Sequence, residues 1–244
     1  SAIRMMSSLS QRLNQYSSFF EILGLSIAHK GSQMKVSTDS RLLTAFAAQF
    51  SYNNVLDIGC GIGTISLLLA KYRSSSFVTA IDMDFEAVEV TRFNIEYNGL
   101  ENLVVLHVDA RDYYSDTKFD LIVSNPPYFI GQMTSNNMGR MKFRHSTADF
   151  PDTVAALCWR QLSVTGVVCF VIFPGTEPAW TYSMAKKGFV LIKYFDIKNR
   201  ESLPSSCALV AYSLTSHNFK SGQIIMTDED GIPLDAFTHW MMGF

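Results

Sequence analysis

The chain has 244 residues, of which 48% are apolar and 17% charged, a composition typical of a globular domain with a full hydrophobic core. Its longest strongly apolar run, Val167 to Phe173, is much shorter than the about 20 residues that a membrane-spanning helix needs, which excludes such a helix. The first residues lack the long apolar core of a signal peptide, so we expect a cytoplasmic protein without membrane attachment.

The net charge of -2 conceals a segregation along the chain. Residues 55–128 carry eleven acidic against five basic side chains, whereas residues 1–54 carry two against five and residues 129–200 carry four against nine. Because location matters more than the total, the basic flanks keep a nucleic-acid partner possible. The alternative is a mixed surface that only faces solvent.

Four widely separated cysteines lie mostly inside apolar runs, with no C-x-x-C pair and no histidine at metal-ligand spacing. We therefore expect reduced core thiols and no metal site. The four are Cys60, Cys158, Cys169 and Cys207.

The first 50 residues are predicted to form an extension that packs on the core. A weak helical pattern runs from Leu9 to Leu25, and a short strand is expected from Leu25 to Ala28. Apolar positions from Leu42 to Ala47 then recur at helical spacing behind Thr38 and Asp39, which are good N-cap residues.

From Val55 onward short apolar strands alternate with amphipathic helices, and this order predicts an α/β fold with a mostly parallel sheet covered on both faces. Residues 196–207 hold too few apolar positions for a covering helix, so the last strand is expected to be antiparallel. Residues 51–244 form one domain on this interpretation. Residues 129–150 have no clear period and are expected to form a long loop, and loops of this length are usually functional or disordered. The seven predicted strands are Val55–Ile58, Phe77–Ile81, Leu103–His107, Phe119–Ser124, Val167–Phe173, Val190–Phe195 and Ala208–Leu214, and the helices are Gly63–Tyr72, Phe85–Tyr97, Thr153–Leu162 and Glu177–Lys187.

Three alternating glycines, Gly59, Gly61 and Gly63, join the first predicted strand of this series to a helix. Glycine permits positive φ and close approach of the backbone. The spacing is not the G-x-G-x-x-G of dinucleotide folds, and Asp57 places a carboxylate where those proteins bind a pyrophosphate. A cationic ligand is therefore favoured.

The run from Asp57 to Gly63 resembles the first motif of the class I S-adenosylmethionine-dependent methyltransferases. That resemblance implies a Rossmann-like fold and S-adenosylmethionine as the cofactor. It also implies roles at the next two strand ends, where Asp82 would bind both ribose hydroxyls, Met83 would lie against the adenine, and Asp109-Ala110 would accept from the adenine amino group. Each acid taken alone could equally be a solvated strand-end residue.

The stretch Asn125-Pro126-Pro127-Tyr128 follows the fourth predicted strand, at the edge of a parallel sheet where ligands bind. Proline fixes φ and restricts the residue before it, so Asn125 is expected to be held extended. The alternative to a catalytic loop is a stiff turn at the end of the strand that has only a structural role. The stretch resembles the signature of amino-methyltransferases, which implies that Asn125 and the Pro126 carbonyl accept the two hydrogens of an exocyclic amine while Tyr128 stacks on a planar base.

Residues on both sides of these motifs resemble the bacterial tRNA adenine-N6 methyltransferase family that acts beside the anticodon of a valine tRNA. The resemblance implies that Thr38 and Asp39 lie near the cofactor's amino-acid end, and that Arg144 and His145 face the substrate. In the family glycine usually stands on both sides of the Thr-Asp pair, where this chain has Ser37 and Ser40. The segment Asp228–Pro233 is similar to the family's terminal hairpin, and the basic residues expected to contact phosphates of the anticodon loop are Lys35, Arg41, Arg140, Lys142 and Arg144.

The leading hypothesis is thus an RNA adenine-N6 methyltransferase, acting as a monomer on tRNA. Glutamine N5-methylation of release factors and guanine-N2 methylation of ribosomal RNA share the Asn-Pro-Pro signature and remain open. A cofactor-binding module that contacts RNA without catalysis is the alternative from another class.

Overall fold

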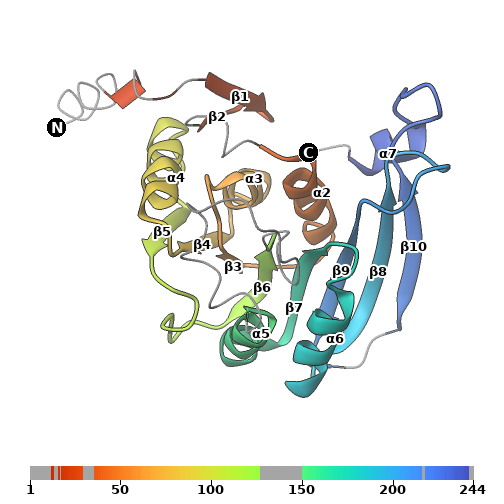
Figure 1. Ribbon diagram of the computed structural model, residues 1–244. Helices are drawn as coiled ribbons and strands as arrows, with labels where there is room; N and C mark the ends of the chain where they lie inside the picture. Colours follow the sequence, from red (N-terminus) through yellow and green to blue (C-terminus); the bar gives the residue numbers. More distant parts are fainter. Residues whose placement is uncertain are drawn as a thin grey trace, which may run out of the picture.

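The computed structural model describes residues 12, 13, 16, 18–29, 36–126, 150–215 and 218–241. Its centre is a sheet of eight strands in the order β10-β8-β9-β7-β6-β3-β4-β5 (Figure 1). All seven predicted strands are present. The eight are β3 (Asn54–Ile58), β4 (Phe77–Asp82), β5 (Leu103–His107), β6 (Phe119–Ser124), β7 (Leu162–Ile172), β8 (Val190–Lys198), β9 (Cys207–Ser213) and β10 (Lys220–Ile225).

The direction of the strands confirms the predicted α/β fold. The strands β5, β4, β3, β6 and β7 are all parallel to one another, and β9 runs antiparallel to both β7 and β8. Because β3 pairs with both β4 and β6, the strand order reverses at β3, and the carboxyl ends of the strands on either side of this switch point form the crevice where open α/β sheets bind ligands.

Helices cover both faces of the sheet (Figure 1). On one face lie α2 (Thr38–Ala47), α3 (Thr64–Tyr72) and α4 (Phe85–Tyr97), and on the other lie α5 (Phe150–Gln161) and α6 (Glu177–Lys186). Each face has its own hydrophobic core, and the four cysteines are free and buried as predicted. Fully buried side chains include Phe46 and Leu68 in the first core and Phe170 and Trp180 in the second.

The start of α2 differs from the sequence-based expectation in one detail. The helix begins at Thr38, but its N-cap is Ser37, whose side chain accepts a hydrogen bond from the backbone N–H of Ser40. Ser37 has an extended backbone at φ -95° and ψ 153°, which a serine adopts as readily as the glycine of the related family. Thr38 and Asp39 therefore belong to the first turn of the helix rather than to its cap.

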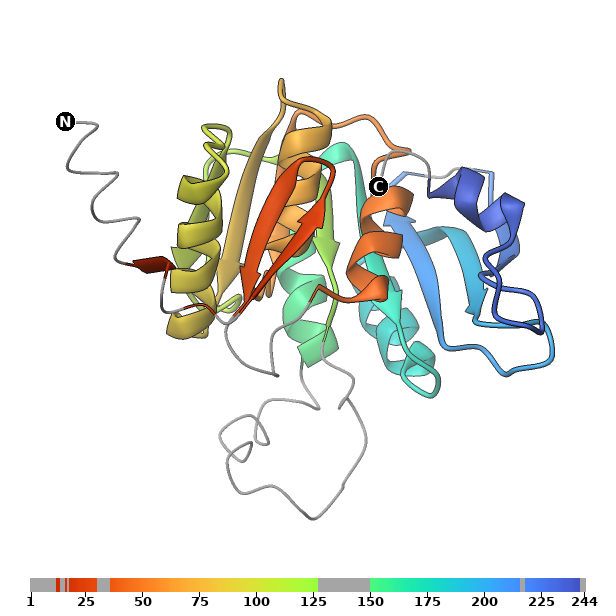
Figure 2. The same cartoon turned by 90° about the horizontal axis from the view of Figure 1, so that it is seen from above.

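A two-stranded hairpin precedes α2 and lies outside the main sheet (Figure 2). It pairs β1 (Ser18–Ile22) with β2 (Leu25–His29) in antiparallel register. The predicted strand is confirmed, whereas the helical expectation is wrong for β1. Asn94 of α4 and Asn98, the C-cap residue of that helix, hold β2 to the core. Their side-chain oxygens accept from the backbone N–H groups of Ala28 and Ser26, respectively, at 2.8 Å each.

The end of the described chain adds a strand and a short helix that sequence periodicity does not predict. β10 pairs with β8 in parallel and extends the sheet, and α7 (Asp235–Trp240) follows. Between them a bridge joins Thr227 to Pro233, and the N–H of Asp228 donates to the carbonyl of Ile232, which confirms the hairpin expected at Asp228–Pro233. Within the described residues no helix combines the length and apolarity needed to cross a membrane.

Candidate active site

The three glycines form a tight loop from β3 into α3. Gly59, Gly61 and Gly63 have φ values of 71°, 57° and 83°, in the left-handed region that disfavours other residues. Gly63 also has no room for a side chain, because an added Cβ would lie 2.7 Å from Cγ2 of Thr91 on α4. Thr91 in turn donates to the carbonyl of Gly61 at 2.7 Å, so α4 fixes the loop from behind.

Asp82, at the end of β4, holds this loop from the other side. Its Oδ2 accepts from the backbone N–H of Gly61 at 2.8 Å, and its Oδ1 accepts from the N–H of Asp84 at 2.9 Å. Burial raises the pKa of the carboxyl above its ordinary value, although the two backbone hydrogen bonds oppose that shift. The carboxylate therefore stands beside the glycine loop with both oxygens oriented, which suits binding of a vicinal diol such as a ribose.

Asp57 behaves differently from Asp82, although the two acids end adjacent strands. Its side chain is completely buried, and its Oδ2 accepts from the hydroxyl of Ser66 on α3 at 2.5 Å. Burial raises the pKa to about 7, an increase that the Ser66 hydrogen bond opposes and the nearby Asp82 charge reinforces. Its Oδ1 has no hydrogen-bond partner among the described residues. Asp57 thus lies behind the glycine loop, and direct contact with the cofactor stays a prediction.

Asp109 follows β5 and is paired with Arg111 through both carboxylate oxygens. The guanidinium donates to Oδ1 from Nε at 3.0 Å and to Oδ2 from Nη2 at 2.6 Å. These hydrogen bonds lower the pKa of the Asp109 carboxyl and keep it ionised. Arg111 is exposed and Asp109 is half-buried at the rim of the cavity described next. A ligand amino group can approach the Asp109 carboxylate from that cavity.

A cavity lies along the carboxyl ends of β3, β4 and β5. It has an apolar wall from the strand ends, acidic groups at its rim, and a closing side formed by the first turn of α5. Five residues predicted for the cofactor from the sequence come together here: Gly59, Asp82, Met83, Asp109 and Ala110. The remaining lining residues are Ile58, Ile81, Val108, Arg111, Phe150 and Thr153.

Two contributors to this cavity, Phe150 and Thr153, were missed by sequence reasoning. They stand on α5, far along the chain from the glycine motif, and an apolar position in a helix carries no signal that distinguishes a cavity wall from core packing. The order of elements did indicate that this helix could reach the cavity. In a parallel sheet a helix that follows a strand begins near the carboxyl end of that strand, and α5 is the helix that follows β6.

Asn125 stands at the same edge, directly after β6, and a side chain of α2 orients it. Its Nδ2 donates to the hydroxyl of Ser40 at 3.2 Å. Ser40 is itself fixed, because its Oγ lies 3.0 Å from the Oγ of Ser37 and its N–H donates to that same atom. With the amide nitrogen taken by Ser40, the Oδ1 of Asn125 has no partner among the described residues and is available as an acceptor. Pro126 behind it is buried.

The residues predicted for the start of α2 occupy the same end of the molecule. Thr38 is exposed and Asp39 half-buried, and the Oδ1 of Asp39 lies 3.9 Å from the sulfur of Cys207 on β9. Arg41 is half-buried in the first turn of α2, and its backbone N–H donates to the carbonyl of Ser37. The remaining predicted site residues lie outside the described part of the chain: Lys35, Pro127, Tyr128, Arg140, Lys142, Arg144 and His145.

Comparison with known proteins identifies the family. Residues 29–150 match the family model of the methyltransferase small domain. A tRNA1(Val) (adenine(37)-N6)-methyltransferase from Phocaeicola vulgatus is 37% identical over 81% of this chain and 84% of its own length. One from Pedobacter heparinus is 33% identical over 89% of this chain and 94% of its own. The chain belongs to this methyltransferase family. It is an S-adenosylmethionine-dependent enzyme, as the glycine motif and the strand-end acids imply.

Solved structures agree with this methyltransferase family at the level of the fold. A predicted O-methyltransferase from Agrobacterium tumefaciens superposes with a TM-score of 0.69 over 84% of this chain and 96% of its own, at 17% identity. At this identity the likeness concerns the arrangement of strands and helices. It supports the assignment of the Rossmann-like sheet, whereas the family assignment comes from the closer relatives by sequence.

The described residues fit S-adenosylmethionine at the cavity. Asp82 offers two carboxylate oxygens to a diol, and Asp109 offers an ionised acceptor to an amino group. Three aliphatic strand-end side chains, Ile58, Ile81 and Val108, provide the apolar wall that a planar base requires. The two carboxyl groups of the lining, Asp82 and Asp109, match a ligand that carries a sulfonium and an ammonium, and Arg111 at the rim is paired with Asp109.

Proposed function

We infer that this protein transfers a methyl group from S-adenosylmethionine to N6 of adenine 37 in tRNA1(Val), in the cytoplasm and as a monomer. The observation that carries the inference is the position of Asn125, whose oriented amide oxygen lies at the same sheet edge as the cavity with Asp82 and Asp109. The names of the family's members supply the tRNA and the base.

The reaction needs acceptors for an exocyclic amine. The lone pair of such a nitrogen is delocalised into the ring, so the amine is a weak nucleophile until its hydrogens are held out of the ring plane. Asn125 Oδ1 would accept one N–H and the Pro126 carbonyl the other. The bound cofactor supplies an electrophilic methyl sulfonium, and in-line alignment of the amine with that group is expected to contribute much of the rate.

No general base is required before transfer. The amine nitrogen becomes strongly acidic once it is methylated, and its extra proton can then pass to water. The protein's contribution is therefore positioning, which explains why Asn125 and a proline carbonyl suffice without a histidine at this point. Pro127 and Tyr128 keep their predicted roles, the first in stiffening the strand exit and the second in stacking against the adenine.

The experiment that tests this function is nucleoside mass analysis of unmodified tRNA1(Val) after incubation with the protein and S-adenosylmethionine. The expected result is a new N6-methyladenosine peak, absent from a matched transcript in which adenine 37 is replaced by guanine. Labelled cofactor offered to the same tRNA together with a release factor separates the main alternative. Label found only in the protein substrate would overturn the proposal in favour of glutamine methylation, and N2-methylguanosine would overturn it in favour of guanine chemistry.

A further inference from the structure

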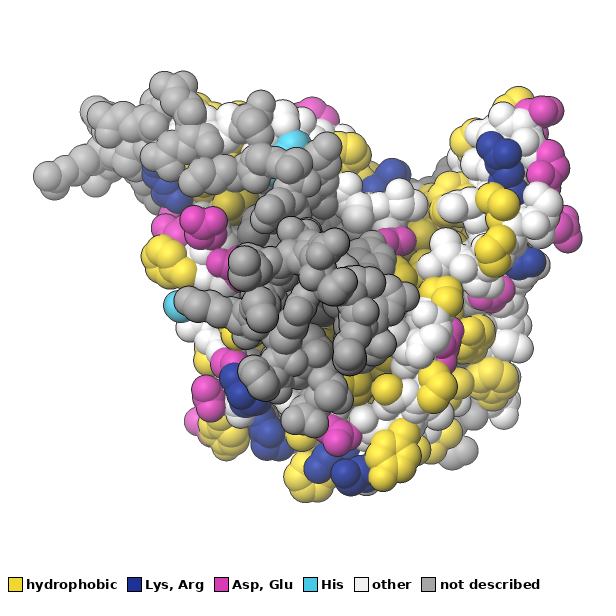
Figure 3. All heavy atoms as spheres, in the orientation of Figure 1, with side chains coloured by type: hydrophobic (Ala, Val, Ile, Leu, Met, Phe, Trp, Pro, Cys, Tyr) yellow, Lys and Arg dark blue, Asp and Glu magenta, His cyan; other side chains and the backbone are white. Residues whose placement is uncertain are grey.

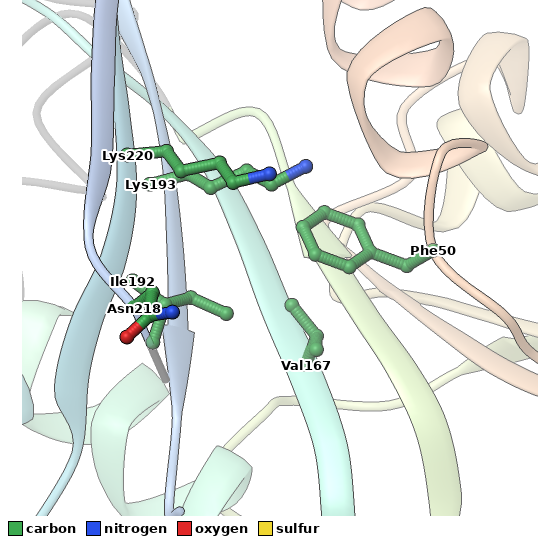
Figure 4. Close-up of a pocket in the computed structure, with 6 residues that line it drawn as sticks. All are labelled: Phe50, Val167, Ile192, Lys193, Asn218 and Lys220. Atoms are coloured by element: carbon green, nitrogen blue, oxygen red, sulfur yellow. The ribbon is translucent and has the colours of Figure 1, made fainter. Parts of the chain in front are cut away.

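A second concave site lies away from the cofactor cavity, between the end of α2 and the outer strands of the sheet. It is a cleft of about 350 Å³ lined by Phe50, Val167, Ile192, Lys193, Asn218 and Lys220. The face shown in Figure 3 is hollowed between α2 and the lobe that β10 and α7 form. In the close-up, the side chains of Lys193 and Lys220 extend in the same direction, toward the ring of Phe50 (Figure 4).

The two lysines stand side by side because of the strand register. Lys193 of β8 and Lys220 of β10 are direct partners in the parallel ladder, so their side chains emerge on the same face of the sheet. Like charges placed opposite each other on neighbouring strands destabilise a sheet. The arrangement is therefore unfavourable unless something compensates the two charges.

Nothing acidic in the described part of the chain compensates them. No carboxylate lies within 4.0 Å of either ammonium group among the described residues. Among the described residues Lys193 contacts a neutral acceptor, Oε1 of Gln49 at 3.4 Å. Its nitrogen also lies over the rings of Phe50 and Phe46, whose centroids are 4.4 Å and 5.9 Å away. The nearest acid on β8, Asp196, accepts from Ser205 and Gln223 instead. Partial burial and the charge of Lys220 both lower the pKa of Lys193.

The position of the cleft relative to Asn125 follows from the same register. Lys193 pairs with Ala211, Ala211 with Cys169, and Cys169 with Val123, which stands two residues before Asn125. Three steps between neighbouring strands amount to about 14 Å across the sheet between the backbones of Lys193 and Val123. A nucleic-acid strand carries a phosphate at every nucleotide, so a few nucleotides cover a span of this size. An RNA with its target base at Asn125 thus brings other backbone phosphates to this distance.

We propose that this cleft binds a backbone phosphate of the tRNA substrate, held between the ammonium groups of Lys193 and Lys220, with the adjoining sugar or base against Phe50. The apolar floor of Val167 and Ile192 suits the carbon atoms of a nucleotide, and the paired ammonium groups suit its charge. This assignment rests on the proposed function for the identity of the RNA. It adds a contact outside the residues that the family signature marks.

The test compares two double variants with the same change in charge. Lys193→Gln with Lys220→Gln removes both charges of the cleft. Lys71→Gln with Lys187→Gln is the matched control, because Lys71 is exposed on α3 and Lys187 is half-buried at the end of α6. Binding of tRNA1(Val) is measured by fluorescence anisotropy from about 50 mM to 200 mM salt, a range over which phosphate contacts strongly change affinity.

The cleft variant is expected to flatten the dependence of log K on log salt by about 1 in total, because one phosphate contact is lost, and to weaken binding at least about tenfold at the lowest salt. Its KM for tRNA should rise while kcat at saturating tRNA stays within about twofold of the wild type, because no reacting atom is touched. The control variant should retain the wild-type slope. A cleft variant with the same slope and affinity as the control would overturn the proposal.

Two further arms keep the result interpretable. Lys220→Gln alone changes an exposed edge residue and should give about half the change in slope, which guards against misfolding of the double variant. Inorganic phosphate is titrated as well, and loss of phosphate binding with unchanged tRNA affinity would overturn the proposal in favour of a small-anion site. The binding assay needs no methyl transfer, so it gives its answer even where the wild type fails to produce N6-methyladenosine.

Discussion

The cofactor half and the transfer half of the active site hold their polar groups in different ways. Asp82 and Asp109 are oriented by residues within two positions of them or by the adjacent glycine loop. Asn125 is oriented by Ser40, a residue 85 positions earlier on another element. The first arrangement is built by local chain geometry, whereas the second exists only after α2 has packed beside the end of β6.

This difference predicts which substitutions should impair each half of the active site. The cofactor half can form wherever the β3, β4 and β5 exits have their normal shape, so its function depends on the acids themselves. The transfer half depends on an acceptor and on the contact that aims it. The comparison is therefore tested by substitutions of the acceptor itself, of the residue that orients it, and of the buried and cavity-lining acids.

The largest effect is expected from Asn125→Ala. It removes the proposed acceptor of the amine, and loss of one polar group aimed at the reacting centre costs about 10²- to 10³-fold in rate. Cofactor affinity, measured by calorimetry, should stay within about twofold, because the acids of the other half are unchanged. Asn53→Ala, at an exposed position before β3, is the matched control and should transfer methyl groups normally. A fully active Asn125→Ala variant would remove Asn125 from the mechanism.

How much the sequence could predict follows the same division between local and distant contacts. The strands β3 to β6, the three strand-end acids and the three glycines have strong local signals. The structure places Gly59, Asp82, Met83, Asp109 and Ala110 in one cavity. β10 escaped prediction because its pattern is mostly exposed, with Gly222 in its centre. That glycine fits because an added Cβ would lie 2.9 Å from the ring of Phe195 on β8.

The support of Asn125 could not be predicted for a related reason. Ser37 and Ser40 stood out only as departures from the glycines of related proteins, and no periodicity links them to a strand exit 85 residues later. Their roles as helix cap and amide partner appear only when α2 and β6 are brought together. The contact between Asp57 and the hydroxyl of Ser66 on α3, and the full burial of Asp57, likewise depend on the packing of α3 on the sheet and carry no signal in the sequence.

The next largest effect is expected at Asp82. Asp82→Ala removes two oriented acceptors from the cavity and also frees the N–H groups of Gly61 and Asp84, so cofactor Kd should rise by about 10- to 100-fold, or about 1.4 to 2.7 kcal/mol. Asp82→Asn keeps one acceptor oxygen and should show a smaller rise. Asp112→Asn, at an exposed acid after β5, is the calorimetric control. Equal cofactor affinity in Asp82→Ala and this control would contradict the assignment.

Asp57 offers a prediction about stability and pH. Its pKa is about 7 in the folded protein and near 3.8 when unfolded, so between these values only the folded state holds the proton. The free energy of unfolding should then fall as pH rises from about 4 to about 7, by up to about 1.4 kcal/mol per pH unit from this group. Asp57→Asn cannot titrate and should show a flatter profile in urea unfolding between about pH 5 and 7.

The difference in the free energy of unfolding between the wild type and Asp57→Asn, taken at each pH, reports on the Asp57 carboxyl because the other titrating groups are common to both proteins. Asp112→Asn removes an exposed acid and should leave the slope of the wild type unchanged. Parallel profiles for the wild type and Asp57→Asn would show that the buried carboxyl is ionised throughout this range. Its unpartnered Oδ1 would then need a compensating contact that the hydrogen bond from Ser66 does not provide.

The smallest effect, and the most specific to this chain, is expected at Ser40. Ser40→Ala leaves the Nδ2 of Asn125 without its hydrogen bond and lets the amide rotate, at a cost of about 1 kcal/mol, or about fivefold in kcat. Ser37→Ala is the matched comparison, because it removes the helix cap and should lower the free energy of unfolding by about 1 kcal/mol. If Ser40 orients the acceptor, Ser40→Ala lowers kcat more than it lowers stability, and Ser37→Ala does the reverse. If the loss in kcat relative to the loss in the free energy of unfolding were the same in both variants, Ser40 would have only a structural role in α2.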